Sequence, residues 1–163
     1  DVVLVAMHWG TENQTDPDDD QPYYADLLTE LEADVVLGSH PHVIGPVEWK
    51  QSASGHWTLV AYSLGNFISH HDDPAPINEL EGMISMDFVR GEAGDITIEN
   101  VLWTPLVNHT QEGAHAVYPL DNYTNELAVA HEKLGDLEDP LTWFYDTSSE
   151  VVNSMGGTFA LAS

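Results

Sequence analysis

The chain has 163 residues, which is the length of one domain with room for a buried apolar core. Its 28 acidic side chains against three basic ones give a formal net charge of −25, which argues against nucleic acids and anionic lipid surfaces as partners. The lack of cysteine excludes disulfides and thiolate metal ligands, so a metal would need His, Asp, Glu or Asn as ligands.

Two explanations of the acidic composition stay open. It can be an adaptation to a salty or cation-rich medium, or it can create a field that concentrates cations near a metal site. No segment reaches the ~20 apolar residues of a membrane-spanning helix, and no signal-peptide pattern opens the chain.

The first two strands and the helix between them can be predicted in chain order. Residues 2–7 predict a strand buried on both faces inside a parallel sheet, and a buried strand so close to residue 1 suggests that upstream sequence has been removed. After an acidic loop, Pro22 and a helical spacing of apolar residues predict an amphipathic helix. Its apolar residues are Tyr23, Tyr24, Leu27, Leu28 and Leu31. Residues 34–38 predict a second buried strand, parallel to the first through a right-handed crossover.

Three histidines follow these two strands. His8 comes after the first strand, and His40 and His42 come after the second. Because parallel strands end at the same edge of a sheet and neighbours lie ~5–10 Å apart, the imidazoles can reach one ion. Pro41 favours an extended His40, which would project His40 and His42 to the same side. A histidine alone is more often a hydrogen-bonded structural residue, so the metal-binding hypothesis depends on the convergence of all three.

Several segments around these histidines resemble one family. The segments are residues 8–12, Gln21, residues 33–43, residues 46–48 and residues 62–68. They are similar to the C-terminal half of the CapA-type capsule-biosynthesis proteins, which are associated with poly-γ-glutamate and belong to the calcineurin-like metallophosphoesterase superfamily. The resemblance is specific up to about residue 70. It weakens toward residue 120 and does not extend beyond.

The resemblance implies a metal site. His8 matches the isolated metal-binding histidine of the superfamily, and His40 and His42 match its paired histidines, with Ser39 just before them. Further ligands and an Asn-His acid pair come from upstream motifs that have no counterpart here, so the catalytic residues stay unknown. The implied cofactors are Mn, Fe or Zn ions, which would form a dinuclear site only when the upstream half is present. Since ligation needs neutral imidazole, we expect metal affinity to fall as the pH drops through about 6.

Six more residues are candidates for the surroundings of the metal or substrate. They are Trp9, Gly10, Glu12, Ser39, Glu48 and Asn66. Glu12 and Glu48 could orient ligating histidines, although solvent exposure is the commoner fate of a carboxylate here. Trp9 could contact substrate or cap the edge of the core, and Asn66 could belong to the site or to a simple turn. Residues 70–73 have a metal-binding composition, but adjacent extended side chains point in opposite directions, which favours a solvated loop.

The rest of the chain has the patterns of a scaffold. The predicted elements are a strand over residues 57–62, a β-hairpin over residues 82–89 and 95–103, and helices over residues 124–134 and 139–152. Residues 136–140 are the candidate linker. We predict an α/β fold, a layered α/β/β/α metallophosphoesterase-like sandwich of which residues 1–120 form the C-terminal part. Residues 121–163 would form a helical extension packed on it.

The functional prediction follows from the resemblance together with the histidines. We predict a metal-dependent hydrolase-like or transferase-like protein of cell-envelope or capsule polymer biosynthesis, located in the cell envelope or outside the cell. Its implied partners are an anionic polymer or a small phosphoester, together with the missing N-terminal half or a second copy of the chain. The alternative is a noncatalytic envelope module with an incomplete metal site, and a third possibility is a fragment that is inert without its first half.

Overall fold

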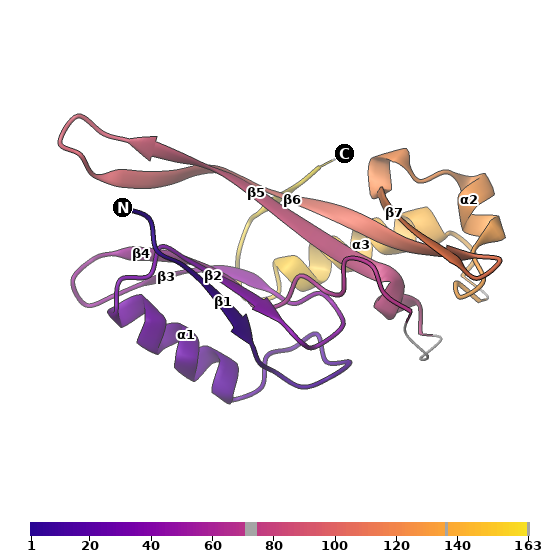
Figure 1. Ribbon diagram of the computed structural model, residues 1–163, viewed down its shortest axis with the longest axis horizontal. Helices are drawn as coiled ribbons and strands as arrows, with labels where there is room; N and C mark the ends of the chain where they lie inside the picture. Colours follow the sequence, from indigo (N-terminus) through magenta and orange to yellow (C-terminus); the bar gives the residue numbers. More distant parts are fainter. Residues whose placement is uncertain (71–74, 136, 163) are drawn as a thin grey trace.

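The computed structural model describes residues 1–70, 75–135 and 137–162 (Figure 1). The predictions for the run at residues 70–73, apart from His70, and for Asp136 in the linker lie outside these described residues. The first sheet has the strand order β1-β2-β4-β3. Its strands are β1 (Leu4–His8), β2 (Val35–Ser39), β3 (Val47–Gln51) and β4 (Trp57–Ala61). β1, β2 and β4 run parallel and β3 pairs with β4 in the antiparallel sense, so the predicted parallel pairing of the first two strands is confirmed.

Helix α1 (Asp20–Glu30) covers one face of the first sheet, but it does so with an unexpected side. The apolar stripe predicted to face the core is largely exposed, with Tyr23 at 64% and Leu31 at 69% exposure. The buried residues are Gln21, Ala25 and Thr29. A small residue at position 25 lets the helix approach the sheet closely, and bulky side chains on that face would hold it away. The prediction of the buried face was therefore wrong, although the helix itself is confirmed.

The position of β1 also differs from the prediction. β1 is an edge strand that pairs with β2 on one side, and among the described residues no strand pairs with its other side. Leu4 is 52% exposed and Val3 is 50% exposed, so the strand is not buried on both faces. The apolar run correctly predicted a strand, but apolar composition alone does not distinguish an interior strand from an edge strand.

The second sheet is built around a long hairpin that crosses over the first sheet (Figure 1). Its strands are β5 (Leu80–Arg90), β6 (Ile96–Gln111), β7 (Ala114–Pro119) and the short β8 (Ala160–Leu161). β5 and β7 pair with β6 in the antiparallel sense, and β8 pairs with β6 in parallel. The predicted hairpin is confirmed, and both of its strands extend further than the alternating pattern indicated.

One apolar cluster joins the two sheets and the C-terminal helices. The helical elements are η1 (Pro76–Glu79), η2 (Leu120–Asn122), α2 (Asn125–Ala130) and α3 (Pro140–Val152). Leu59 from the first sheet, Trp103 from the second and Phe144 from α3 are fully buried in this cluster. The indole N–H of Trp103 donates to the Ser148 hydroxyl at 3.0 Å, which fixes α3 on β6. Two sheets with flanking helices confirm the predicted α/β fold class.

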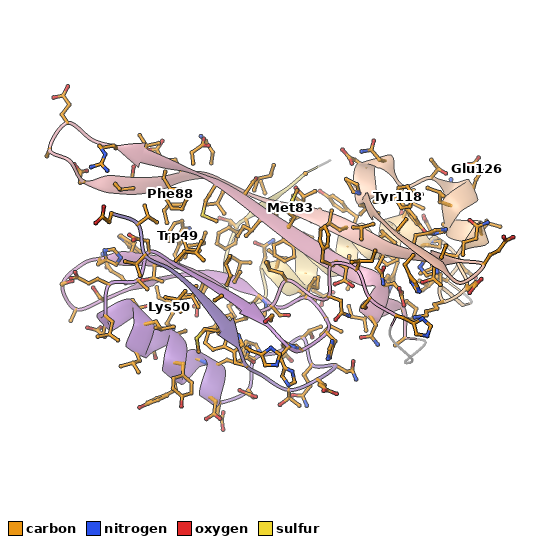
Figure 2. All side chains as sticks on the ribbon, in the orientation of Figure 1. Trp49, Lys50, Met83, Phe88, Tyr118 and Glu126 are labelled. Atoms are coloured by element: carbon orange, nitrogen blue, oxygen red, sulfur yellow. The ribbon has the colours of Figure 1, made fainter. Side chains whose placement is uncertain are left out.

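The last two helices begin as predicted, and one of them ends early. Asp139 caps α3 through the Thr142 amide at 3.2 Å, and the helix runs to Val152. α2 ends at Ala130, short of the predicted Leu134, because the His131 ring turns back to the carbonyl of Asn108 at 3.2 Å. In Figure 2, Lys50 lies beside α1 on the left and Glu126 lies on α2 on the right. Within the described ranges, no helix is long and apolar enough to cross a membrane.

Candidate metal centre

The three histidines converge where β1 and β2 end. His8 lies opposite Ser39 in the ladder between these two strands. The ring centroids of His8 and His40 are 4.5 Å apart, and those of His40 and His42 are 5.9 Å apart. The structure therefore brings together the imidazoles that the crossover was expected to gather at one sheet edge.

The backbone of this cluster differs from the sequence-based expectation. His40 has a φ of 103° and His42 a φ of 65°, so His40 is not extended as the following proline suggested. The loop turns sharply instead, and the amide of Asn13 donates to the carbonyl of Pro41 at 2.7 Å. This tertiary hydrogen bond outweighs the local preference that Pro41 imposes on its neighbour. Left-handed backbone at residues with side chains is uncommon and tends to cluster at functional sites.

Glu12 joins two of the histidines to form a group of possible ligands. One donor atom each from Glu12, His40 and His42 lies within 4.8 Å of the other two, and Nε2 of His42 is 3.9 Å from Oε1 of Glu12. A bound ion such as Zn²⁺ holds its ligands at ~2.0–2.2 Å, so small rotamer changes would close this group around it. Two imidazoles and a carboxylate suit Mn, Fe or Zn. The His8 ring lies beside the His40 ring at a tilt of 43°, next to this three-donor group.

Asn66 fixes the orientation of the His42 ring. Its side-chain N–H donates to the carbonyl of His42 at 3.0 Å, and its Oδ1 lies 2.7 Å from Nδ1 of His42. Since Oδ1 can only accept, Nδ1 of His42 carries the proton and Nε2 keeps its lone pair on the side of Glu12. A hydrogen bond of this kind to the second ring nitrogen is what orients ligating histidines. The structure therefore places Asn66 in direct contact with His42.

Next to Asn66 lies a buried carboxyl group, that of Glu81, which was not among the predicted site residues. Glu81 is fully buried and accepts a hydrogen bond from the backbone amide of Asn66, and the amide of Phe67 also favours its charged form. Burial raises the pKa of Glu81 to about 8, although the two amides act in the opposite direction. The available signal was an acidic residue inside the apolar run of residues 80–84, where a charge needs a specific partner.

Trp9, Gly10 and Ser39 have structural contacts near the cluster. The indole N–H of Trp9 donates to the carbonyl of Tyr62 at 2.8 Å, and the ring is 7% exposed, which matches the interpretation of Trp9 as a cap on the core. Gly10 has a φ of 85°, and a Cβ there would lie 2.8 Å from Oε1 of Gln21. The hydroxyl of Ser39 donates to the carbonyl of Met7 at 3.1 Å and ties β2 to β1.

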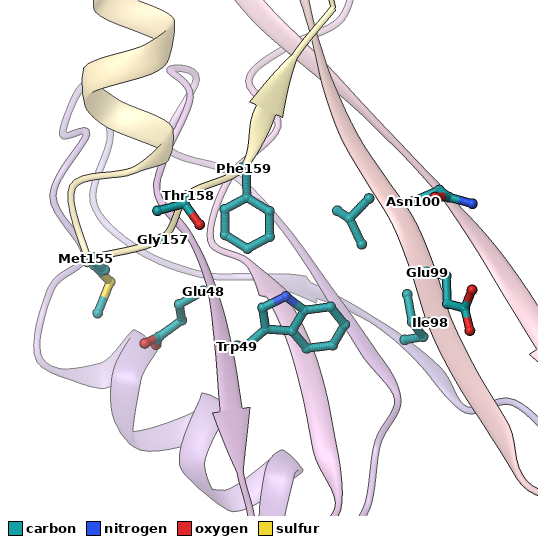
Figure 3. Close-up of a pocket in the computed structure, with 11 residues that line it drawn as sticks. Glu48, Trp49, Ile98, Glu99, Asn100, Met155, Gly157, Thr158 and Phe159 are labelled. Carbon is teal, nitrogen blue, oxygen red and sulfur yellow. The ribbon is translucent and has the colours of Figure 1, made fainter.

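Glu48 lies in a different environment from the histidines. Its Oε1 accepts from the hydroxyl of Tyr62 at 2.6 Å and from Nζ of Lys50 at 3.2 Å, and within the described part of the chain it forms no hydrogen bond with a histidine. Glu48 also lines a cavity of about 460 Å³ together with Trp49 and Phe159 (Figure 3). None of the three histidines lines this cavity.

Comparison with known proteins gives matches to the part of the chain that carries the histidines. Residues 1–71 match the family described as "Bacterial capsule synthesis protein PGA_cap". The "PGA biosynthesis protein CapA" of Bacillus subtilis (strain 168) is 41% identical over 68 residues. Residues 1–71 are thus similar to CapA-type proteins, and this matched stretch is the CapA-type segment of the chain. The "Capsule biosynthesis protein CapA" of Bacillus anthracis is 36% identical to it over 69 residues.

The matched region is a small part of these CapA proteins. Each match covers 42% of this chain, but only 17% of the B. subtilis protein and 15% of the B. anthracis protein. No solved structure matches the chain at a significant level. The CapA-type segment contains the first sheet, α1, the three histidines and Asn66, whereas Glu81 and the second sheet follow it.

Proposed function

We propose that this chain supplies one side of a divalent-metal centre for a hydrolase-like or transferase-like activity in capsule or cell-envelope polymer metabolism, with poly-γ-glutamate as the implied substrate. The observation that supports this most directly is the group of donor atoms from Glu12, His40 and His42 with His8 beside it. The names of the CapA relatives support the biological setting, and a place in the cell envelope is part of the proposal.

The residues of the centre have separate tasks in this proposal. His40, His42 and Glu12 hold the ion, and Asn66 keeps Nε2 of His42 aimed at it. A divalent cation supplies polarisation of a phosphoryl or carbonyl oxygen and lowers the pKa of a bound water. A second ion would need further ligands, and we propose that an upstream half of the protein supplies them. We expect the coding sequence upstream of Asp1 to contain the corresponding Asp and Asn-His motifs.

The acidic surface limits how a polyanion can bind. A net charge of −25 repels a carboxylate polymer over a Debye length of ~8 Å at physiological ionic strength. Bound divalent cations would reduce this repulsion where the polymer meets the strand ends. Substrate binding in this proposal therefore depends on the cation as well as on the protein.

The test is metal binding by the chain and by single histidine variants. We expect the wild-type chain to bind Mn²⁺ or Zn²⁺ near stoichiometrically in calorimetry, and the loaded protein to hydrolyse a generic phosphodiester once it is joined to its upstream half. His40→Ala and His42→Ala should both lose the ion. His56→Ala is the matched control, because His56 contacts Asp34 at 3.6 Å, away from the donor group. Equal binding by all four proteins would exclude these histidines as ligands.

One observation favours the noncatalytic alternative strongly enough to keep it. Among the described residues the donor group has three members, which is enough for one ion and fewer than a dinuclear centre requires. A chain that binds the ion through His40 and His42 but hydrolyses no phosphodiester, even when joined to its upstream half, would be a polymer-handling module. The same protein joined to an active upstream half would restore turnover if this chain is part of the enzyme.

A further inference from the structure

We propose that Glu81 is a positioning residue for His42, acting through the loop at residues 65–67 and the side chain of Asn66. The predicted effect of Glu81 on metal affinity rests on the proposed function. The effect of Glu81 on the His42 ring can be measured in the metal-free protein. Glu81 lies outside the CapA-type segment, so the matched region alone does not contain the carboxyl group that holds the Asn66 loop.

The loop and the carboxyl group meet where the two sheets are joined. Glu81 is the second residue of β5, and the amide of the next residue, Gly82, donates to the carbonyl of Leu64 at 2.9 Å. Gly65 has a φ of 77°, and a Cβ at this position would lie 2.0 Å from Oε2 of Glu81. Only glycine therefore allows the loop to close directly over the carboxyl group.

The hydrogen bonds of Glu81 are directed to this loop. Its carboxyl group accepts from the backbone amide of Asn66, and the amide of the next residue, Phe67 (φ 66°), also favours the charged carboxylate. The other oxygen, Oε1, is buried and has no hydrogen-bond partner among the described residues. Keeping a carboxyl group in such a place is costly, and an apolar side chain would avoid that cost while leaving both loop amides unpaired.

Asn66 transmits the position of the loop to the histidine. Its backbone amide contacts Glu81, while its side chain forms two hydrogen bonds with His42, one to the ring and one to the main-chain carbonyl. Loss of the acceptor at Glu81 would release the Asn66 backbone and weaken both of those bonds. Nδ1 of His42 would no longer be held as the protonated nitrogen, so its Nε2 lone pair would face the ion for only part of the time.

Glu79 provides a matched control two residues earlier in the chain. It is also fully buried, but its carboxylate faces Lys133 at 3.0 Å and the side-chain N–H of Asn108 at 3.1 Å. A general effect of neutralising a buried carboxyl group would appear in Glu79→Gln as well. If the carboxyl group acts on His42 through Asn66, only substitution of Glu81 should change the His42 ring.

The experiment compares Glu81→Leu, Glu81→Gln and Glu79→Gln with the wild type. Nitrogen-15 NMR of the metal-free proteins reports the His42 tautomer, and calorimetry reports Zn²⁺ affinity. We expect Glu81→Leu to shift His42 toward a mixture of tautomers and to weaken Zn²⁺ binding ~10–100-fold. Glu81→Gln keeps an acceptor oxygen and should retain the wild-type tautomer, with affinity within ~3-fold. Glu79→Gln should leave the His42 spectrum unchanged.

Each result supports or overturns the proposal. An unchanged His42 tautomer in Glu81→Leu overturns it, and so does a Glu81→Gln protein that behaves like Glu81→Leu. If circular dichroism shows that Glu81→Leu does not fold, Glu81→Asp takes its place, because a shorter side chain withdraws the acceptor while staying polar. A wild-type chain that binds no Zn²⁺ would contradict the proposed function, while the NMR comparison would still decide the role of Glu81.

Discussion

Two histidine clusters, the strand-end cluster of His8, His40 and His42 and the buried cluster of His109 and His131, show how differently the same side chain can be used. In the strand-end cluster, His42 has one ring nitrogen bound to Asn66 and the other directed toward a group of possible ligands. In the buried cluster, His131 donates through Nε2 to the carbonyl of Asn108 and accepts at Nδ1 from the amide of Lys133. The buried ring already has both nitrogens engaged by backbone, so it holds the structure together and has no lone pair for an ion.

Burial separates the two clusters further. The His131 side chain has no solvent exposure, and this burial, reinforced by nearby His109, lowers its pKa to about 4. The side chain of His42 is 34% exposed. A histidine can therefore be assigned to binding or to structure by asking where each ring nitrogen points and which partner it has.

The largest expected difference between the clusters is in stability. His131→Leu should lower the free energy of unfolding by about 3 kcal/mol, because it leaves the buried carbonyl of Asn108 and the partly buried amide of Lys133 unpaired. His40→Ala should change it by less than about 0.5 kcal/mol in metal-free protein. Urea unfolding measures both values. Similar losses in the two variants would mean that the strand-end cluster is also a structural element.

Zinc should stabilise the protein through the strand-end cluster alone. At a free concentration of about 100 times Kd, a ligand that binds only the folded state adds about 2.7 kcal/mol to its stability. We expect Zn²⁺ to raise the melting temperature of the wild type and of His56→Ala, and to leave that of His40→Ala unchanged. A thermal shift that persists in His40→Ala would place the ion elsewhere.

The buried cluster should make the protein sensitive to acid. Because the folded pKa of His131 is about 4, below the ordinary value of 6.5, the unfolded state takes up a proton first as the pH falls. This lowers stability by about 2 kcal/mol between pH 7 and pH 5. Glu81 acts in the opposite sense, since its raised pKa of about 8 lowers stability as the pH rises above about 4.5.

The contribution of His131 to this pH dependence can be isolated by difference. Urea unfolding of the wild type and of His131→Leu is measured at pH 5, 6 and 7. The difference in free energy of unfolding between the two proteins should be smallest at pH 5. The wild type loses stability as His131 becomes protonated in the unfolded state, and the leucine variant has no such group. A gap that stays constant over this range would show that His131 titrates normally in the fold.

The smallest predicted effect concerns the exposed member of the donor group. Glu12 has a side chain that is 61% exposed, so it adds less to ion binding than the histidines do. We expect Glu12→Gln to weaken Zn²⁺ binding ~10-fold in calorimetry, with no change in unfolding free energy. A loss as large as that of His40→Ala would show that Glu12 is an indispensable ligand.

The sequence predicted the convergence of the histidines because it depends on topology alone. A strand, a helix and a second strand within forty residues leave His8 and His40 at one sheet edge whatever the side chains do. The left-handed backbone of His40 was not predictable in the same way, since it accompanies a hydrogen bond between Pro41 and Asn13, which lie 28 residues apart in the chain.

Other features depend on long-range packing that periodicity does not report. The buried face of α1 is the one on which the small Ala25 lets the helix approach the sheet closely. The spacing of the apolar residues around Leu31 did not predict which face that would be. Glu81 acquires its role only when the second sheet meets the loop that contains Asn66. Both depend on contacts between segments far apart in the sequence.

The open side of β1 gives the two halves of the strand-end cluster unequal rigidity. His8 ends a strand that is paired along one edge, whereas β2, which leads to His40, lies between β1 and β4. Among the described residues no strand pairs with the other edge of β1, so we expect amide hydrogens there to exchange with deuterium faster than those of β2. Fraying of β1 would then move His8 away from its neighbours more often than His40. An ion would therefore first contact His40 and His42, and His8 would approach it afterwards.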